Sequence, residues 1–167
     1  MKIWFTCTAR EFQSACVRGY FGEEWDEPLG EDLWLKDQLK QRLPGFQGPP
    51  LFCMDTNPGE AFHNCESSHV IEAEIPEDRV LHFFWSGFML HASAGMFLAM
   101  NAEETAAADT TPPDDATVLA SWDRMFTHVT ELEEYLGAEF YRYVTDRVLF
   151  EDVTDILKIV VPPGRSH

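Results

Sequence analysis

The chain has 167 residues, of which 45% are hydrophobic and 13% aromatic, so it can bury a core and is not intrinsically disordered. Its 29 acidic and 12 basic residues give a formal net charge of −17, with 15 acids in residues 1–80 and 14 in residues 81–167. A negative field of this strength repels phosphate backbones and argues against direct nucleic-acid binding. We predict one domain over residues 1–167.

The first third of the chain predicts strands and helices in alternation. The opening residues are rich in β-branched and aromatic side chains, and Gly19 marks the end of the helix that follows. Leu35, Leu39 and Leu43 recur on one stripe of a second helix. The predicted elements are a strand at 2–8, a helix at 9–18, an acidic loop at 22–28, a helix at 29–43 and a strand at 51–54.

The stretch from residue 70 to 100 is the most apolar part of the chain, and we predict that the core forms around it. Alternating faces indicate a strand at 70–75, which Pro76 ends in a turn. Residues 80–85 are apolar on both faces, as in a buried strand, and residues 88–100 carry almost no charge, as in an interior helix. His82, Ser86 and other small or polar residues interrupt this run, so it does not indicate a membrane span.

The last third begins with an acidic, proline-containing segment at 101–118, which we predict to be a mobile loop. A helix is expected at 121–136, with a kink near Thr130, followed by short apolar runs at 140–144, 148–150 and 156–161. The pattern favours an α+β fold: a single domain with a curved mixed or antiparallel sheet and three to four helices.

Four residues suggest a zinc site by their chemistry, but their spacing does not support one. Cys53, His63, Cys65 and His69 are separated by nine, one and three residues, which is not the spacing of a zinc finger or knuckle. We therefore predict no metal. The cysteines form no closely spaced pair and the first residues do not resemble a secretion signal, so free thiols in the cytoplasm are expected.

Six short motifs occur in order along the chain and carry a resemblance to a known family. They are K-I-W-F-T at 2–6, W-L-K-D-Q-L-K-Q-R at 34–42, P-L-F-C-M at 50–54, I-E-A-E-I-P-E-D-R-V-L at 71–81, S-W-D-R-M-F at 121–126 and F-E-D-V-T-D-I-L-K-I at 150–159. Together they resemble an uncharacterised domain family of bacteria and phages. The resemblance extends over nearly the whole chain, with the motifs in the same order. The chain departs from that family at Phe83 and Phe84, where the family has polar residues. Because the family has no known function, the resemblance implies a fold and a phage or bacterial source and does not indicate a particular activity.

A second, more distant likeness is to the ADP-ribosyltransferase-like fold, which also opens with strand, helix and glycine and ends with two strands around an acidic turn. This likeness implies an NAD-dependent transferase as an alternative function, with NAD as cofactor. Arg10, just past the first strand, and Glu139 or Asp146, late in the chain, are the catalytic candidates under this alternative. The full catalytic set of that superfamily is not present in the sequence.

The absence of a complete set of catalytic residues and the high negative charge favour a small interaction protein, which binds and inhibits a partner by covering a basic, nucleic-acid-binding surface. It would need no cofactor and no membrane. A purely structural role stays open as a third reading. The predicted contact residues are the acids of the two loops, Glu23, Glu24, Asp26, Glu27, Asp114 and Asp115.

Overall fold

The computed structural model describes residues 1–22, 30–59 and 68–159, and these contain eight strands and six α-helices. The strands are β1 (Lys2–Cys7), β2 (Tyr20–Phe21), β3 (Leu51–Cys53), β4 (His69–Glu74), β5 (Leu81–His82), β6 (Tyr143–Thr145), β7 (Val148–Leu149) and β8 (Val153–Lys158). The helices are α1 (Ala9–Arg18), α2 (Glu31–Arg42), α3 (Ala102–Thr110), α4 (Asp115–Ser121), α5 (Arg124–Thr127) and α6 (Val129–Leu136). A π-helix (Gly87–Ala92) and two 3₁₀ turns (Glu77–Arg79 and Phe150–Asp152) complete the described elements.

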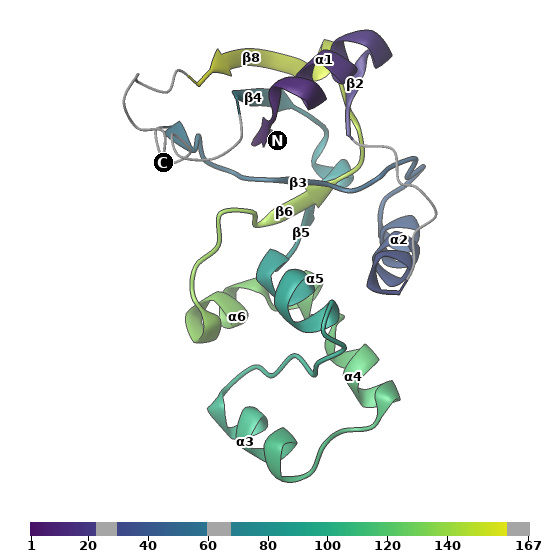
Figure 1. The fold of residues 1–167 in the computed structure, drawn as a ribbon, viewed down its shortest axis with the longest axis vertical. Coiled ribbons are helices and arrows are strands. Elements are labelled where there is room, and N and C mark those ends of the chain that lie inside the picture. The colour runs from purple at the N-terminus through teal and green to yellow at the C-terminus, as the bar shows by residue number, and fades with distance from the viewer. Residues whose placement is uncertain (23–29, 60–67, 160–167) are drawn as a thin grey trace.

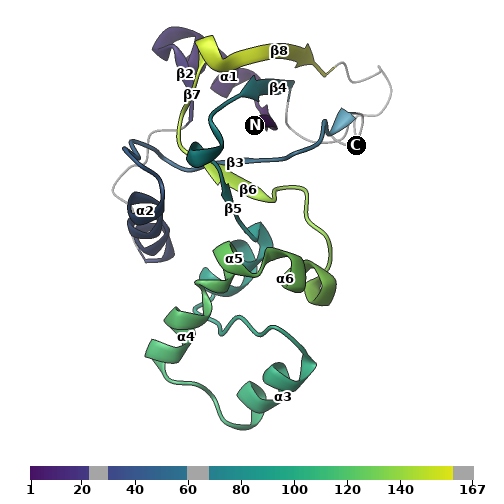
Figure 2. The ribbon, with the colours of Figure 1, turned by 180° about the vertical axis from the view of Figure 1, so that it is seen from behind.

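The α+β class is confirmed, and all the observed strand pairings are antiparallel. The strands divide among three small sheets, with the orders β1-β4-β8, β2-β7 and β3-β6-β5. The sheets occupy one end of an elongated molecule, and α3 and α4 occupy the other (Figure 1). Seen from behind, β7 follows the course of β2, with which it pairs (Figure 2).

Local signals account for the first elements, which form as predicted. Thr8 and Glu11 cap the start of α1 reciprocally: Glu11 N–H donates to Thr8 Oγ1 at 3.2 Å, and Thr8 N–H donates to Glu11 Oε2 at 2.5 Å. Gly19 ends α1 with a left-handed φ of 84°. In α2, Leu35 and Leu39 are fully buried, which confirms the predicted apolar stripe.

Two hydrophobic clusters form the core. One lies among the sheets and contains Ile3, Phe5, Cys7, Ala15, Phe21, Cys53, Ile71, Ala73, Ile75, Tyr143 and Val148. The other joins α2 to the short helices and contains Leu35, Leu39, Leu43, Phe83, Phe84, Phe88, Ala92, Leu98, Trp122, Met125, Val129, Leu132 and Val144. Thus the predicted central stretch contributes to both clusters. None of the helices in the described ranges has the length and apolar character needed to cross a bilayer.

The central stretch differs from its prediction after residue 82. The expected strand at 80–85 pairs only over β5, although Phe83 and Phe84 are fully buried. The interior helix expected at 88–100 is a π-helix that ends at Ala92, and Leu90 is 65% exposed. Beyond Gly95, whose φ is 65°, the chain is irregular, and its backbone groups bond to the side chains of Ser121, Trp122 and Arg124.

The expected loop at 101–118 is also corrected, because most of it is helical. The side chain of Asn101 accepts from Glu104 N–H at 2.9 Å and starts α3, in which alanines favour the helix. Asp114 starts α4 in the same way and accepts from Thr117 N–H at 2.8 Å. Conversely, the single helix expected at 121–136 is replaced by two short helices, α5 and α6, which follow the end of α4 at Ser121. The helical path is interrupted at Trp122 and Asp123 and again at His128.

Candidate functional site

The acidic contact residues predicted from the sequence fall in two places. Asp114 and Asp115 are exposed at the start of α4. The other four, Glu23, Glu24, Asp26 and Glu27, lie outside the described residues. Of the predicted contact surface, the described residues therefore contain only the part at the α3–α4 end of the molecule.

The three residues of the NAD-dependent alternative have separate surroundings. Arg10 is exposed on α1 and has no ion-pair partner among the described residues. Asp146 is buried and forms an ion pair with Arg79, with 2.6 Å between Oδ1 and Nη2. Glu139 accepts from the backbone N–H of Ser86, at 2.9 and 3.0 Å from its two oxygens. The carboxylates of Asp146 and Glu139 thus hold backbone and side-chain groups of the fold, and the described contacts do not join the three residues.

The cysteine and histidine set of the zinc reading is only half described. Cys53 is buried in β3, and His69 stacks on Phe12 with ring centroids 4.1 Å apart. His63 and Cys65 lie outside the described residues. Among the residues that the structure describes, no group of three or more His, Cys, Asp or Glu side chains could hold a metal ion.

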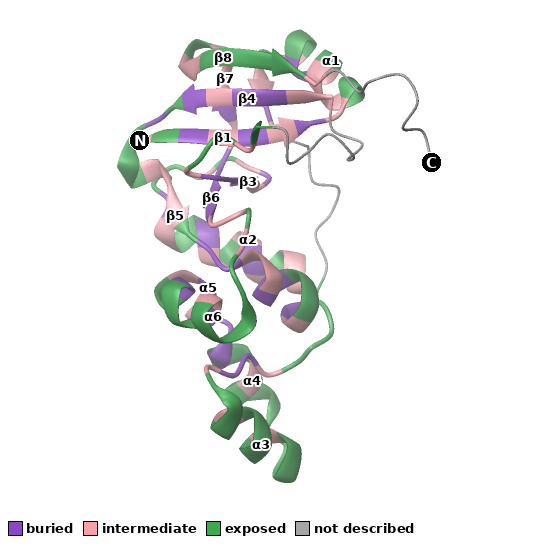
Figure 3. Ribbon diagram, turned by 90° about the vertical axis from the view of Figure 1, so that its left-hand side faces the viewer, coloured by how far each residue is buried: buried purple, intermediate pink, exposed green. Residues whose placement is uncertain are grey.

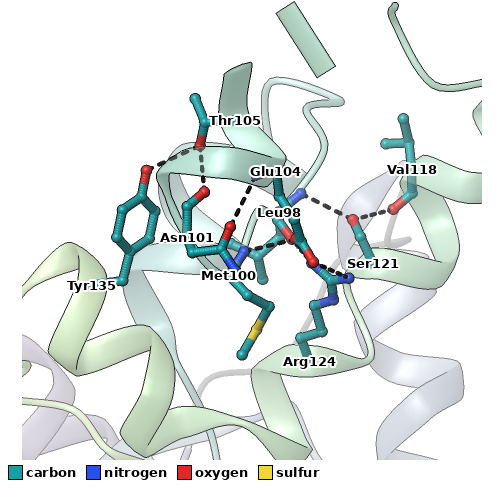
Figure 4. Close-up of polar contacts among 9 residues, drawn as sticks. All are labelled: Leu98, Met100, Asn101, Glu104, Thr105, Val118, Ser121, Arg124 and Tyr135. Carbon is teal, nitrogen blue, oxygen red and sulfur yellow. Dashed lines mark hydrogen bonds and ion pairs between the residues drawn. The ribbon is translucent and has the colours of Figure 1, made fainter. Parts of the chain in front are cut away.

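The segment of residues 96–100 connects the π-helix to α3, and side chains hold its backbone. Leu98 N–H donates to Ser121 Oγ at 2.9 Å, and Leu98 O accepts from Arg124 Nη1 at 2.7 Å (Figure 4). Trp122 Nε1 donates to Met96 O at 2.8 Å. These bonds satisfy backbone groups that an irregular segment would otherwise leave unpaired.

Glu104 links α3 to the segment of residues 96–100 through hydrogen bonds. Its Oε2 accepts from Met100 N–H at 2.9 Å and from Arg124 Nη1 at 2.5 Å (Figure 4). Partial burial alone would raise the pKa of Glu104, but the hydrogen bond from Met100 and the Arg124 guanidinium outweigh it and lower that pKa. From the other side, the Tyr135 hydroxyl of α6 lies 3.0 Å from Thr105 Oγ1. The start of α3 is therefore fixed from both α5 and α6.

A groove lies along α3 and is formed by two adjoining cavities of about 720 and 340 Å³. Phe97, Ala108 and Pro113 line both cavities. Every residue of α3 is exposed or half-buried, which makes this end of the molecule the most accessible helical surface in Figure 3. We call this feature the α3 groove; it is lined by Met96, Phe97, Thr105, Ala107, Ala108, Thr111, Pro113, Thr117, Val118, Tyr135 and Leu136, among others.

The charge around the α3 groove is mostly negative, with one cation beside it: Arg124 pairs with Glu104 and lies over the Phe97 ring, 5.3 Å from its centroid. Residues 101–118 contain five acidic residues (Glu103, Glu104, Asp109, Asp114 and Asp115) and no basic one. Within the described part of the chain, no Lys or Arg lines either cavity. His91 lines the smaller cavity, and burial lowers its pKa, an effect that the Ser86 backbone partly opposes. The α3 groove combines an apolar floor with an acidic rim.

Comparisons with family models, with curated proteins and with solved structures give no match for this chain. The resemblance to the bacterial and phage family therefore stays a prediction. The α3 groove is therefore the feature that bears on what the chain does.

The α3 groove has the chemistry of a binding surface. Its polar groups are carboxylates, hydroxyls and backbone amides, and its lining is otherwise aliphatic and aromatic. The sequence-based prediction named Asp114 and Asp115, which follow the lining residue Pro113 in the chain, and did not name the floor residues Phe97, Ala108 and Pro113. The signal that could have found them is the Asn101 cap ahead of the alanine run, because it indicates an exposed helix instead of a loop.

Proposed function

We propose that this chain is an acidic interaction protein, and that its α3 groove binds a basic amphipathic segment of a partner protein. The observation that carries the proposal is the apolar floor around Phe97, Ala108 and Pro113 with a rim of carboxylates and no lining Lys or Arg among the described residues. A helix with one apolar face fits such a groove, and Lys or Arg on its flanks would lie against the acidic rim.

The charge of the whole chain supports this choice of partner. With a net charge of −17, the chain attracts basic surfaces at long range and repels acidic ones. Basic amphipathic surfaces are frequent in proteins that bind nucleic acids, and covering one would block its access to the phosphate backbone. Binding would then inhibit the partner, in a cytoplasm whose reducing conditions suit the free thiols Cys7, Cys16 and Cys53.

The NAD-dependent transferase is a weaker alternative. Transfer chemistry needs its groups within hydrogen-bond reach of one substrate, and the described contacts tie Glu139 to Ser86 and Asp146 to Arg79. An NAD-induced melting shift would revive this alternative.

A defined peptide tests the proposal without knowledge of the natural partner. The probe is a fluorescent helical peptide of Leu and Lys, about 18 residues long, with its leucines on one face. Binding is followed by fluorescence anisotropy at low and at physiological salt. We expect saturable binding that weakens with salt, and weaker binding of a peptide of the same composition whose leucines are distributed around the helix.

Two variants separate the rim from the floor. Replacing Asp114 and Asp115 by Asn keeps the cap on α4, since Asn caps as well as Asp, and should weaken binding roughly threefold to tenfold at low salt. Ala108→Leu fills the floor and should weaken binding roughly tenfold at any salt. Ala102→Leu, on the same helix but outside the groove lining, is the control. Equal affinity for both peptides, or equal effects of the two Ala→Leu changes, would contradict the proposal.

A further inference from the structure

A third cavity, distinct from the α3 groove, opens between β1, α2 and the segment that leads into β3. Its volume is about 420 Å³, which suits one side chain or a small ligand. Thr6 and Leu35 lie on its walls, and Phe52, Trp85 and Tyr141 contribute aromatic rings. We call it the aromatic cavity.

The aromatic rings of this cavity are held in place. The centroids of Trp85 and Tyr141 are 5.4 Å apart, with 58° between the ring planes. The Tyr141 hydroxyl lies 3.3 Å from Thr6 Oγ1 of β1, and Phe52 stacks on Phe83 with centroids 5.5 Å apart. The faces that a ligand would meet are therefore set before it binds.

Two carboxylates line the same cavity. Glu11 uses Oε2 to cap α1 through Thr8 N–H, which leaves its second oxygen available. Asp32 lies in the first turn of α2, and the described residues offer it no hydrogen-bond or ion-pair partner. Burial and, to a smaller degree, the neighbouring Glu31 raise the pKa of Asp32, so a cation placed beside it would stabilise its charged form.

The composition of the lining points to one class of ligand. Among the described residues that line the cavity there is no Lys, Arg or His to balance Glu11 and Asp32. Aromatic faces attract cations, and a planar guanidinium can stack on a ring while it donates to a carboxylate. We propose that the aromatic cavity binds a guanidinium group, which stacks on an exposed ring face of the Trp85–Tyr141 pair, with Asp32 as its counter-ion.

A guanidinium group can come from an arginine side chain of a partner or from a free small molecule. In the first case the cavity would supply a second anchor beside the α3 groove, although the inference does not depend on that groove. The two proposals can fail separately, because Ala108→Leu changes the groove and leaves the aromatic cavity intact.

The test uses Nα-acetyl-arginine methylamide and its neutral isostere, Nα-acetyl-citrulline methylamide, which differ in charge and hardly in shape. Binding is followed by nuclear magnetic resonance through the indole N–H of Trp85, assigned with the variant Trp85→Phe. We expect a saturable shift with the arginine compound, with a dissociation constant on the order of 1 mM, and none with citrulline. Ethylguanidinium, a free guanidinium compound of the same charge as the arginine compound, is titrated in parallel, and tighter binding of ethylguanidinium would identify a small molecule as the source.

Variants complete the test. Asp32→Asn should weaken binding of the arginine compound roughly fivefold or more, whereas Asp37→Asn, on an exposed position of the same helix, should leave it unchanged. Unchanged spectra away from the cavity show that both variants fold. Equal shifts with citrulline and arginine, or equal losses in the two variants, would overturn the proposal, because binding would then not depend on the charge of the ligand or on the Asp32 carboxylate.

Discussion

The guanidinium of Arg124 and the carboxylate of Glu104 are 2.5 Å apart and join α5 to α3, two helices that the sequence separates by a proline-containing turn and by α4. The same guanidinium donates to Leu98 O at 2.7 Å. Arg124 thus holds both the segment that enters α3 and α3 itself, and the shape of the α3 groove depends on it.

Replacing Arg124 by Gln should loosen this end of the molecule. The change removes the ion pair and the donor to Leu98 O, and both groups are only partly exposed, so we expect a loss of roughly 1–2 kcal/mol. In a chain of this size that corresponds to a fall in melting temperature of roughly 2–8 °C. Amide hydrogen exchange should rise over residues 98–110 more than in β1 and β4.

Arg10→Gln is the matched control, because Arg10 is exposed and has no ion-pair partner among the described residues. It should change the free energy of unfolding by no more than about 0.5 kcal/mol. If Arg124→Gln were as mild as this control, or if exchange rose uniformly, Arg124 would not hold the groove.

The ion pair between Arg79 and Asp146 predicts that Asp146, a catalytic candidate under the NAD-dependent alternative, contributes to the free energy of unfolding. The Asp146 side chain is only 10% exposed, and Arg79 Nη2 also donates to Arg147 O at 2.9 Å. Asp146→Ala leaves this guanidinium without its near partner and should cost roughly 2–4 kcal/mol, measured by urea unfolding. Asp152→Asn is the comparison: Asp152 Oδ2 is 3.9 Å from Arg79 Nη1, so its loss should cost roughly 1 kcal/mol or less. Equal losses of unfolding free energy in the two variants would show that Arg79 does not pair preferentially with Asp146.

Elements specified by neighbouring residues could be predicted from the sequence. The glycine after α1 and the leucine stripe of α2 are local features, and they appear as expected. The reciprocal cap of Thr8 and Glu11 is equally local, although it was not among the predictions. The strand β4 likewise follows from alternation, and the chain turns after it at Pro76, where the ring excludes a strand.

The α3 groove could not be predicted in the same way, because distant residues create it. The bond from Trp122 Nε1 to Met96 O spans 26 residues, and that from Leu98 N–H to Ser121 Oγ spans 23. These bonds replace the helix that apolar composition favoured over residues 88–100. The alanine run of α3 is surrounded in the sequence by Pro112, Pro113 and acidic residues, and this composition predicts a loop.

The thiols should differ sharply in reactivity. Cys16 is exposed on α1, whereas Cys7 and Cys53 are buried in strands. Burial, helped by the charge of Glu11 and by Cys16, raises the pKa of Cys7 to about 12, and burial raises the pKa of Cys53 as well. Because the thiolate is the reactive form, Cys7 should be alkylated far more slowly than Cys16 at pH 8.

The measurement uses the variant Cys65→Ser, because Cys65 lies outside the described residues. Iodoacetamide and mass spectrometry should then find one rapidly labelled thiol in the folded protein and three in urea. Rapid labelling of Cys7 or Cys53 without denaturant would contradict the buried positions of β1 and β3.

Glu139 predicts a pH dependence of stability whose sign can be worked out. Its carboxylate accepts from Ser86 N–H ahead of the π-helix. Burial raises the pKa of Glu139, with a further rise from Glu133, and this outweighs the hydrogen bonds from Ser86 and the Trp85 backbone. The folded chain therefore holds this proton more tightly than the unfolded chain, and the contribution of Glu139 to the free energy of unfolding falls as pH rises through its folded pKa.

Glu139→Gln removes the titrating group but keeps a carbonyl oxygen that can accept from Ser86 N–H. The free energy of unfolding of the variant minus that of the parent should therefore become more positive between about pH 4 and about pH 7, because the parent alone loses stability from this group as pH rises. Chemical denaturation at each pH gives this difference, and titrations common to both proteins cancel in it. Glu134→Gln, at an exposed position of α6, should give a difference that stays nearly flat with pH. A flat or falling difference for Glu139→Gln would mean that the carboxylate is ionised as easily in the folded chain as in the unfolded one, and that it serves only as a hydrogen-bond acceptor for the π-helix.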